Sequence, residues 1–209
     1  MSAAVVLSPD HLDDVIDVFA DAFRDYPVMR FVVGQDGDIA ARVRRLITLF
    51  VTRRVRRGGP MRGVFDGPRL VGAAILTLPV EPEPPADIAA IADEAWRDLG
   101  ESARARYQAY ADAASTFFSD LGPHHHLNMI GIRRSHAGQG LARPLLEHVA
   151  QMAAGDPLST GVSLTTELAR NVTLYEHFGY RVVVHREVAP GLESWGLFRP
   201  QLSSLASGR

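Results

Sequence analysis

The sequence predicts a mixed α/β protein, and three patterns carry this prediction. Short apolar runs of strand length alternate with segments in which apolar residues recur at helical spacing. Asp66-Gly67-Pro68 separates two apolar runs in the way that a hairpin turn does. The segment 124–152 passes from an apolar run through a glycine-rich turn into a helical pattern. With 209 residues, 46% of them hydrophobic, the chain is long enough for the core of a soluble globular protein.

The expected elements follow the order β-α-α-β-β-α-β-α-β-α-β-β. Ser8 and Pro9 begin the first helix as N-cap and first helical residue, and this helix ends near Pro27. Strands are expected at 3–8, 61–65, 69–79, 124–132, 161–168, 180–188 and 191–200. Helices are expected at 8–27, 38–57, 88–118 with a break at Gly100, 140–152 and 171–179. We interpret residues 1–209 as one domain, with a helical insertion at about 81–122 and a frayed tail at 201–209.

The composition excludes several kinds of chemistry. All 22 basic residues are arginine, so no lysine can form a Schiff base or anchor a phosphate, and the absence of cysteine excludes disulfides, thiolate metal sites and a Cys nucleophile. A net charge of −2 argues against nucleic acid as a partner. No apolar run of about 18 residues is present, and the N-terminus turns acidic too early for a signal peptide. We therefore expect a cytoplasmic protein without a membrane partner; monomer and homodimer both stay open.

Two charged segments each have two interpretations. The arginines at 53–57 end a predicted helix, where a solvated basic face is favourable; a basic patch is the alternative. A solvated linker and helix face is the favoured interpretation of the acidic segment at 81–101, and attraction of a cationic amine is the alternative. Its acids are Glu81, Glu83, Asp87, Asp93 and Glu94.

The turn at 137–142 has the features of an anion-binding loop. Gly138, Gly140 and Ala142 let an anion approach the backbone closely, and the first N–H groups of the following helix have no intrahelical partners. A P-loop is excluded because it needs a lysine. A dinucleotide-binding turn is disfavoured because Arg143 stands where the third glycine would be. A glycine-rich turn without a ligand is the remaining alternative.

Two blocks resemble the GCN5-related N-acetyltransferase (GNAT) superfamily. Ala137-Gly138-Gln139-Gly140-Leu141-Ala142 is similar to its acetyl-CoA signature R/Q-x-x-G-x-G/A, except that Ala137 replaces Gln or Arg. In "LARNVTLYEHFGYRVV", Asn171, Tyr175 and Gly179 have the register of a later family signature. The stretches "DAFRDYPVMRFVV", "LFVTR" and "NVTLYEHFGYRVVVHREV" resemble the puromycin N-acetyltransferase branch in particular.

The resemblance implies a fold and a co-substrate. The fold would be a central mixed sheet, flanked by helices and splayed at its fourth and fifth strands, with the thioester of acetyl-CoA in the gap. Backbone groups at Ile130, Gly131 and Ile132 would bind the pantetheine amides as an added strand does. Residues 138–142 (Gly138, Gln139, Gly140, Leu141, Ala142) would bind the pyrophosphate, and Asn171 would bond a cofactor amide, cap its helix, or do both.

The reaction implied is direct transfer of an acetyl group to a primary amine of a small molecule in a ternary complex, since no cysteine can carry an acyl group. Tyr175 is the expected general acid for the leaving thiolate, with packing in its helix as the alternative. Relatives often place a glutamate where Thr165 stands. Glu167 lies two residues on, on the same side of the strand, and is the candidate base; an amine of low pKa would need no strong base.

Further candidates line the acceptor side. Asp25 and Tyr26 are expected to shape the acceptor pocket, and His126 is a candidate for its wall, with surface exposure as the alternative. We expect no metal, because strand alternation lets only His124 and His126 of the histidine run share a ligand. A non-catalytic acyl-CoA-binding or regulatory domain of the same fold stays the rival interpretation.

Overall fold

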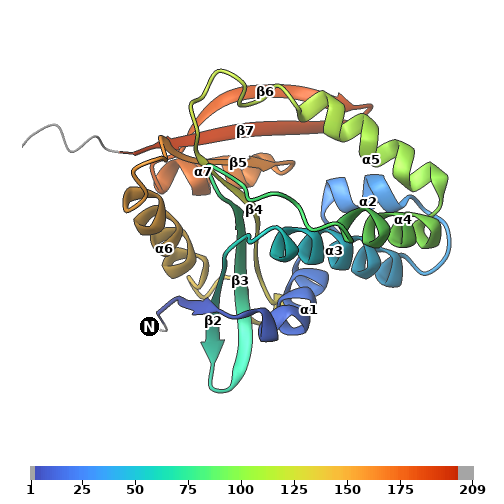
Figure 1. Cartoon of the computed structure of the whole chain (residues 1–209), viewed down its shortest axis with the longest axis horizontal. Coiled ribbons are helices and arrows are strands. Elements are labelled where there is room, and N and C mark those ends of the chain that lie inside the picture. Colours follow the sequence, from blue (N-terminus) through green and yellow to red (C-terminus); the bar gives the residue numbers. More distant parts are fainter. Residues whose placement is uncertain (1–2, 202–209) are drawn as a thin grey trace, which may run out of the picture.

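The structure is a computed structural model and describes residues 3–201, so nearly all of the expected frayed tail lies outside the described residues. Its centre is a seven-stranded mixed sheet in the order β1-β2-β3-β4-β5-β7-β6 (Figure 1). The strands are β1 (Val5–Leu7), β2 (Met61–Asp66), β3 (Arg69–Thr77), β4 (His125–Ile132), β5 (Gly161–Thr166), β6 (Arg181–Ala189) and β7 (Leu192–Pro200). The helices are α1 (Leu12–Ala22), α2 (Pro27–Val33), α3 (Ile39–Arg56), α4 (Ile88–Leu99), α5 (Glu101–Ala114), α6 (Ala142–Ala154) and α7 (Ala169–His177). The mixed α/β prediction is confirmed.

The first predicted helix is wrong as a single element. Ser8 and Pro9 begin a short 3-10 turn, α1 follows from Leu12, and Pro27 begins a separate helix, α2, in place of ending the first. Proline is favoured at the first position of a helix, and the residue before it is pushed into extended conformation. Tyr26 accordingly has ψ of 135°, so the chain changes direction here.

Helices cover both faces of the sheet. On one face, α1 packs on β3 and β4, α3 on β3, α2 on β7 and α5 on β6, and α4 packs on α3 and α5. The core of this face includes Phe19, Leu46 and Ile75. On the other face, α6 and α7 enclose a second apolar cluster that includes Leu145 and Leu164 (Figure 1). None of the helices in residues 3–201 is long and apolar enough to cross a membrane.

The sheet opens between β4 and β5. These neighbours run parallel, but they pair only from His125 to Leu127 on β4 and from Val162 to Leu164 on β5. Both strands continue past these pairs, β4 to Ile132, so their later residues have no partner across the gap. The expected splay between the fourth and fifth strands is therefore present.

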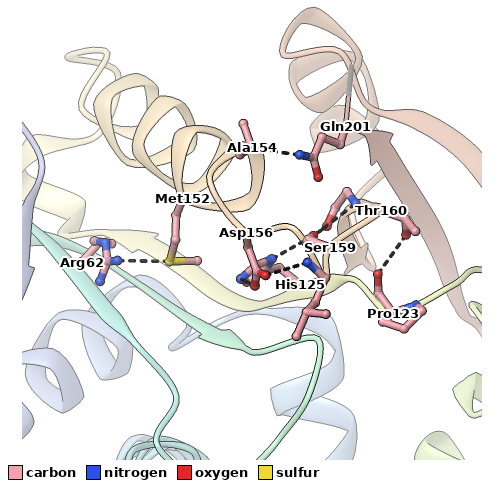
Figure 2. A network of polar contacts seen from close by, with 11 residues as sticks. Arg62, Pro123, His125, Met152, Ala154, Asp156, Ser159, Thr160 and Gln201 are labelled. Carbon is pink, nitrogen blue, oxygen red and sulfur yellow. Dashed lines mark hydrogen bonds and ion pairs between the residues drawn. The ribbon is translucent and has the colours of Figure 1, made fainter. Parts of the chain in front are cut away.

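A polar network holds the closed end of this junction together (Figure 2). His125, at the start of β4, bonds Ser159 Oγ through Nδ1 at 3.0 Å, and its Nε2 lies 3.5 Å from Asp156. The N–H of Thr160 donates to the carbonyl of Pro123, and the N–H of Gln201 donates to that of Thr160, both at 2.8 Å. The start of β4, the approach to β5 and the end of β7 are thus tied before the strands diverge.

Candidate active site

A cavity of about 360 Å³ lies where β4 and β5 separate. Helices α2, α3 and α5 form one side of it, and β4, β5 and α7 form the other. Tyr26, His126, Glu167, Asn171 and Tyr175, which are sequence candidates from three distant segments, all line it. Thr165 lines it together with Glu167, as expected for two residues on the same side of an extended segment.

Glu167 is the buried carboxylate of this cavity. Tyr110 Oη and Ser194 Oγ donate hydrogen bonds to its Oε1 at 2.9 and 2.8 Å, whereas its Oε2 accepts none from the described residues. Burial raises the pKa of Glu167 above its ordinary value, and hydrogen bonding by Ser194, Tyr110 and Tyr26 opposes that rise. A fixed carboxylate with a raised pKa and one open oxygen can accept a proton at neutral pH.

Thr166 joins Glu167 to the acceptor side of the cavity. Its Oγ1 shares a hydrogen bond of 2.9 Å with the hydroxyl of Tyr26, and the backbone N–H of Glu167 donates to the same Tyr26 hydroxyl at 3.1 Å. Asn171 Nδ2 also donates to Thr166 Oγ1, at 3.1 Å. The end of β5 is therefore fixed by the hydroxyl of Tyr26, the N-cap residue of α2, and by one amide from α7.

The expected cap at Asn171 is wrong. Helix α7 begins at Ala169, its N-cap is Leu168, and no side chain caps it, so Asn171 lies within the first turn. Its side chain bonds Thr166 and lines the cavity. The cofactor contact expected of Asn171 stays a prediction.

Tyr175 projects from α7 into the gap and is 8% exposed. Its ring packs edge-on against Tyr180, with centroids 5.8 Å apart. Burial, and after it the charge of Glu167, raise the pKa of Tyr175 above its ordinary value. The phenol therefore keeps its proton at neutral pH, which a general acid must do before the reaction.

Two further sequence candidates lie in different surroundings, one in the cavity and one at the surface. His126 lines the cavity, where its Nδ1 bonds Ser163 Oγ at 2.7 Å, and burial lowers the pKa of His126 to about 4. Asp25 is exposed, forms an ion pair with Arg134 at 3.0 Å and is not among the residues that line the cavity. Tyr26, its neighbour, forms the pocket wall without it.

The open side of β4 faces the gap with two backbone amides. The N–H of Arg133 donates to Val71 at 2.8 Å, which makes this pair a hydrogen-bonded one in the antiparallel ladder with β3. Because such pairs alternate, Gly131 also faces β3, whereas Ile130 and Ile132 direct their N–H and C=O groups away from it. Gly131 is small for another reason: a Cβ there would lie 2.9 Å from Cβ of Ala22 on α1.

The glycine-rich turn has the backbone that its sequence indicates. Gly138 and Gly140 have φ of 77° and 75°, which is the left-handed region that favours glycine, and the space beside both is open. Helix α6 begins directly afterwards at Ala142. The first N–H groups of this helix are open to an anion on the exposed side of the turn.

A second array of serine, histidine and aspartate lies outside the cavity. In Figure 2, His125 stands between Ser159 and Asp156. Ser159 is 8% exposed and donates its hydroxyl to the carbonyl of Gly161 at 2.9 Å, and His125 is 1% exposed. A nucleophile must reach its substrate, so this array supports the sheet junction instead of a reaction.

The arginine prediction is corrected by the structure. We expected a solvated face at 53–57, but Arg53, Arg54 and Arg57 line the cavity and only Arg56 is exposed. The acids of the 81–101 segment do not line the cavity. Glu81 pairs with Arg54, and Asp87 pairs with Arg56.

The sequence analysis also missed Tyr110 and Ser194. Tyr107 and Tyr110 are spaced three apart on α5 and face the cavity together, a spacing that could have indicated a shared face. Ser194 carries no such signal, because only the antiparallel pairing of β5 with β7 brings it near Glu167.

Comparison with known proteins identifies the family of this chain. The family described as "Acetyltransferase (GNAT) domain" matches residues 90–194. The chain belongs to the GNAT acetyltransferases. It is an acyltransferase, and members of this family transfer acetyl groups from acetyl-CoA. No curated protein sequence matches the chain.

Solved structures share the GNAT fold at low sequence identity. A histone acetyltransferase HPA2 and related acetyltransferase from Corynebacterium glutamicum superposes with a TM-score of 0.75 at 18% identity, covering 99% of this chain and 100% of the other. The C-terminal condensation domain of Ebony, in complex with beta-alanyl-dopamine, gives 0.69 at 13%, covering 96% and 99%. The polyamine N-acetyltransferase of Drosophila melanogaster gives 0.57 at 17%, covering 95% and 100%. The puromycin N-acetyltransferase branch stays a prediction.

Proposed function

We propose that this GNAT protein is an acetyl-CoA-dependent N-acetyltransferase of small molecules that uses cytoplasmic acetyl-CoA. The observation that carries the proposal is the meeting of Glu167 and Tyr175 in one cavity at the splay of β4 and β5. Because both halves of the chain contribute walls to this cavity, we propose that residues 1–209 form one catalytic domain.

The residues of the gap fit acetyl-CoA. The outward amides of Ile130 and Ile132 would bind the pantetheine arm as an added strand, with the small Gly131 between them. The turn from Gly138 to Ala142 would hold the pyrophosphate on backbone N–H groups. Bound there, the thioester supplies an activated acetyl carbonyl.

Glu167 is proposed as the general base. Its open Oε2 would take the proton that the amine loses when the nitrogen bonds the carbonyl carbon. Tyr110 and Ser194 fix the other oxygen, so the carboxylate keeps one orientation. Tyr26, bonded to Thr166, would bound the acceptor beside it, and His126 would form the neutral wall.

Tyr175 is proposed as the general acid. When the C–S bond breaks, the phenol would give its proton to the sulfur of the departing thiolate. The proton that Glu167 took from the amine would then pass to the phenolate of Tyr175, so that both groups regain their starting protonation states. With no cysteine in the chain, the acetyl group passes directly from sulfur to nitrogen in a ternary complex.

Relatives of the same fold support an amine acceptor. One solved structure is an arylalkylamine N-acetyltransferase 2 from Aedes aegypti and another is a polyamine N-acetyltransferase. The test is to mix purified protein with acetyl-CoA and a panel of primary amines and to follow release of free thiol. Thiol release that depends on the amine supports the proposal. CoA binding without thiol release for any amine would favour the non-catalytic acyl-CoA-binding domain.

A further inference from the structure

Three arginines gather at one end of the cavity. Arg53, Arg54 and Arg57 come from the end of α3 and line it together. Arg54 and Arg57 share a single carboxylate, that of Glu81, and Arg53 has no ion-pair partner among residues 3–201. This end of the cavity therefore carries more positive charge than its protein neighbours balance.

Two of these guanidinium groups also have unused hydrogen bonds. The Nε atoms of Arg53 and Arg57 are buried and have no hydrogen-bond partner in the described residues, as are those of Arg45 and Arg62, which lie outside the cavity. A buried guanidinium N–H without an acceptor is costly, and an anion is the acceptor whose charge and geometry match it. An anion in the cavity is therefore a favourable partner for these arginines, because Glu81 is a single carboxylate beside three guanidinium groups.

The phosphates of acetyl-CoA are unsuitable as this partner. The arginines lie near the start of β4. Leu76 pairs with Leu127 on that strand, and the carbonyl of Leu76 lies next to Gly59 and the side chain of Arg54. The pyrophosphate turn follows the far end of β4 at Ile132. From Leu127 to Ile132 the strand spans roughly 17 Å. The anion must therefore belong to the acceptor.

The rest of the cavity defines the remaining parts of that acceptor. Glu167 supplies the negative group at which an amine loses its proton. Phe23, Phe50 and Tyr107 give the cavity an aromatic lining. We propose, on the basis of the proposed function, that the acceptor is a primary amine that also carries a carboxylate or a phosphate, and that Arg53 and Arg57 bind this anionic group.

The experiment compares amines that differ only in the anionic group. L-phenylalanine is paired with phenethylamine, and O-phosphoethanolamine with ethanolamine, each assayed by thiol release from acetyl-CoA. One charge-assisted contact is worth about 1.5–3 kcal/mol, so we expect kcat/KM to favour the anionic member of a pair by about 10-fold to 100-fold. The carboxylate pair and the phosphate pair distinguish the two sources of the anion.

Variants assign the effect to the arginines. Arg53→Met and Arg57→Met keep the length of the apolar stem and remove the charge, so the preference should be lost mainly through KM. Arg53→Lys should restore part of it. Arg56→Met is the matched control, because Arg56 is exposed on the same helix and pairs with Asp87; it should keep the preference.

Two results would overturn the inference. One is an equal or greater kcat/KM for the neutral amines in the wild-type protein. The other is an equal loss for both members of a pair in Arg53→Met, which would mean that the arginine is only structural. If no amine releases thiol, the proposed function fails. Calorimetry of N-acetyl-L-phenylalanine with the CoA-bound protein then tests whether the arginines bind an anionic group. Binding that weakens in Arg53→Met supports the site, and binding that ignores the substitution overturns it.

Discussion

The hydroxyl of Tyr110 donates a hydrogen bond to Oε1 of Glu167 at 2.9 Å, and Ser194 donates to the same oxygen at 2.8 Å. These residues come from α5 and β7, which are far apart in the chain. The two bonds favour the charged form of Glu167, whereas burial disfavours it. Burial thus raises the proton affinity of the proposed base, and two residues that need not contact the substrate lower it.

Ser194→Ala should move the acidic limb of the pH–kcat/KM profile to higher pH. Removing a bond to the carboxylate leaves burial less opposed, so the pKa of Glu167 rises further. Activity is lost as pH falls through this pKa, because the base becomes protonated. Ser102→Ala, on the exposed side of α5, is the control. An unchanged limb in Ser194→Ala would remove Glu167 from the role of base.

Tyr175→Phe should lower kcat by about 10²-fold or more while the affinity for CoA changes little, because only proton donation to the sulfur is lost. Tyr180→Phe is a matched control: the two rings are in contact, and the hydroxyl of Tyr180 is buried without a hydrogen-bond partner among the described residues. Single-turnover kinetics and calorimetry of CoA separate the two effects. Equal rates in Tyr175→Phe and the wild-type protein would contradict the assignment.

Gly140→Ala should weaken CoA binding. Its φ of 75° strains any residue with a Cβ by about 1–2 kcal/mol, even though the space around it is open. Gly67→Ala, in the β2–β3 turn with φ of 55° and equally open space, carries a similar strain far from the cavity. Both should lower the midpoint of thermal unfolding by similar amounts, but only Gly140→Ala should raise the Kd for CoA. Equal Kd values for Gly140→Ala and the wild-type protein would show that this turn does not bind CoA.

The sequence predicted the strands better than the surroundings of the cavity. Periodicity indicates which side chains are buried within one element. This was enough to predict all seven strands at their observed places in the chain. It failed at Pro27, since a proline that ends one helix and a proline that begins the next look alike in sequence. Tyr26 was identified as a pocket residue, although the helix that positions it was not.

The arginines show a different limit. Arg53 and Arg57, four residues apart on α3, have the spacing of a shared helix face, and such a face near a C-terminus is favourable in water. Only the packing of α3 over the gap between β4 and β5 turns this face toward the cavity. Contacts between segments distant in sequence, such as Ser194 with Glu167, leave no local pattern at all.

Protonation of His126 should destabilise the protein in acid. Burial lowers its pKa to about 4, whereas an unfolded chain takes up this proton near pH 6.5. Between these values the unfolded state binds more protons, so the free energy of unfolding falls as pH falls from about 6.5 to about 4, by at most about 3 kcal/mol. Below that range both states are protonated and this contribution stays constant.

The groups around His126 support the sign of this effect. Arg54 and His124 also lower the pKa of His126, and Ser163 bonds Nδ1. His126→Asn keeps a polar group near Ser163 but cannot become charged. Urea unfolding at pH 7 and pH 5 should therefore show a smaller loss of stability for His126→Asn than for the wild-type protein. The exposed His177→Asn should match the wild-type slope. A His126→Asn slope as steep as that of the wild-type protein would show that His126 is not the group whose protonation destabilises the fold.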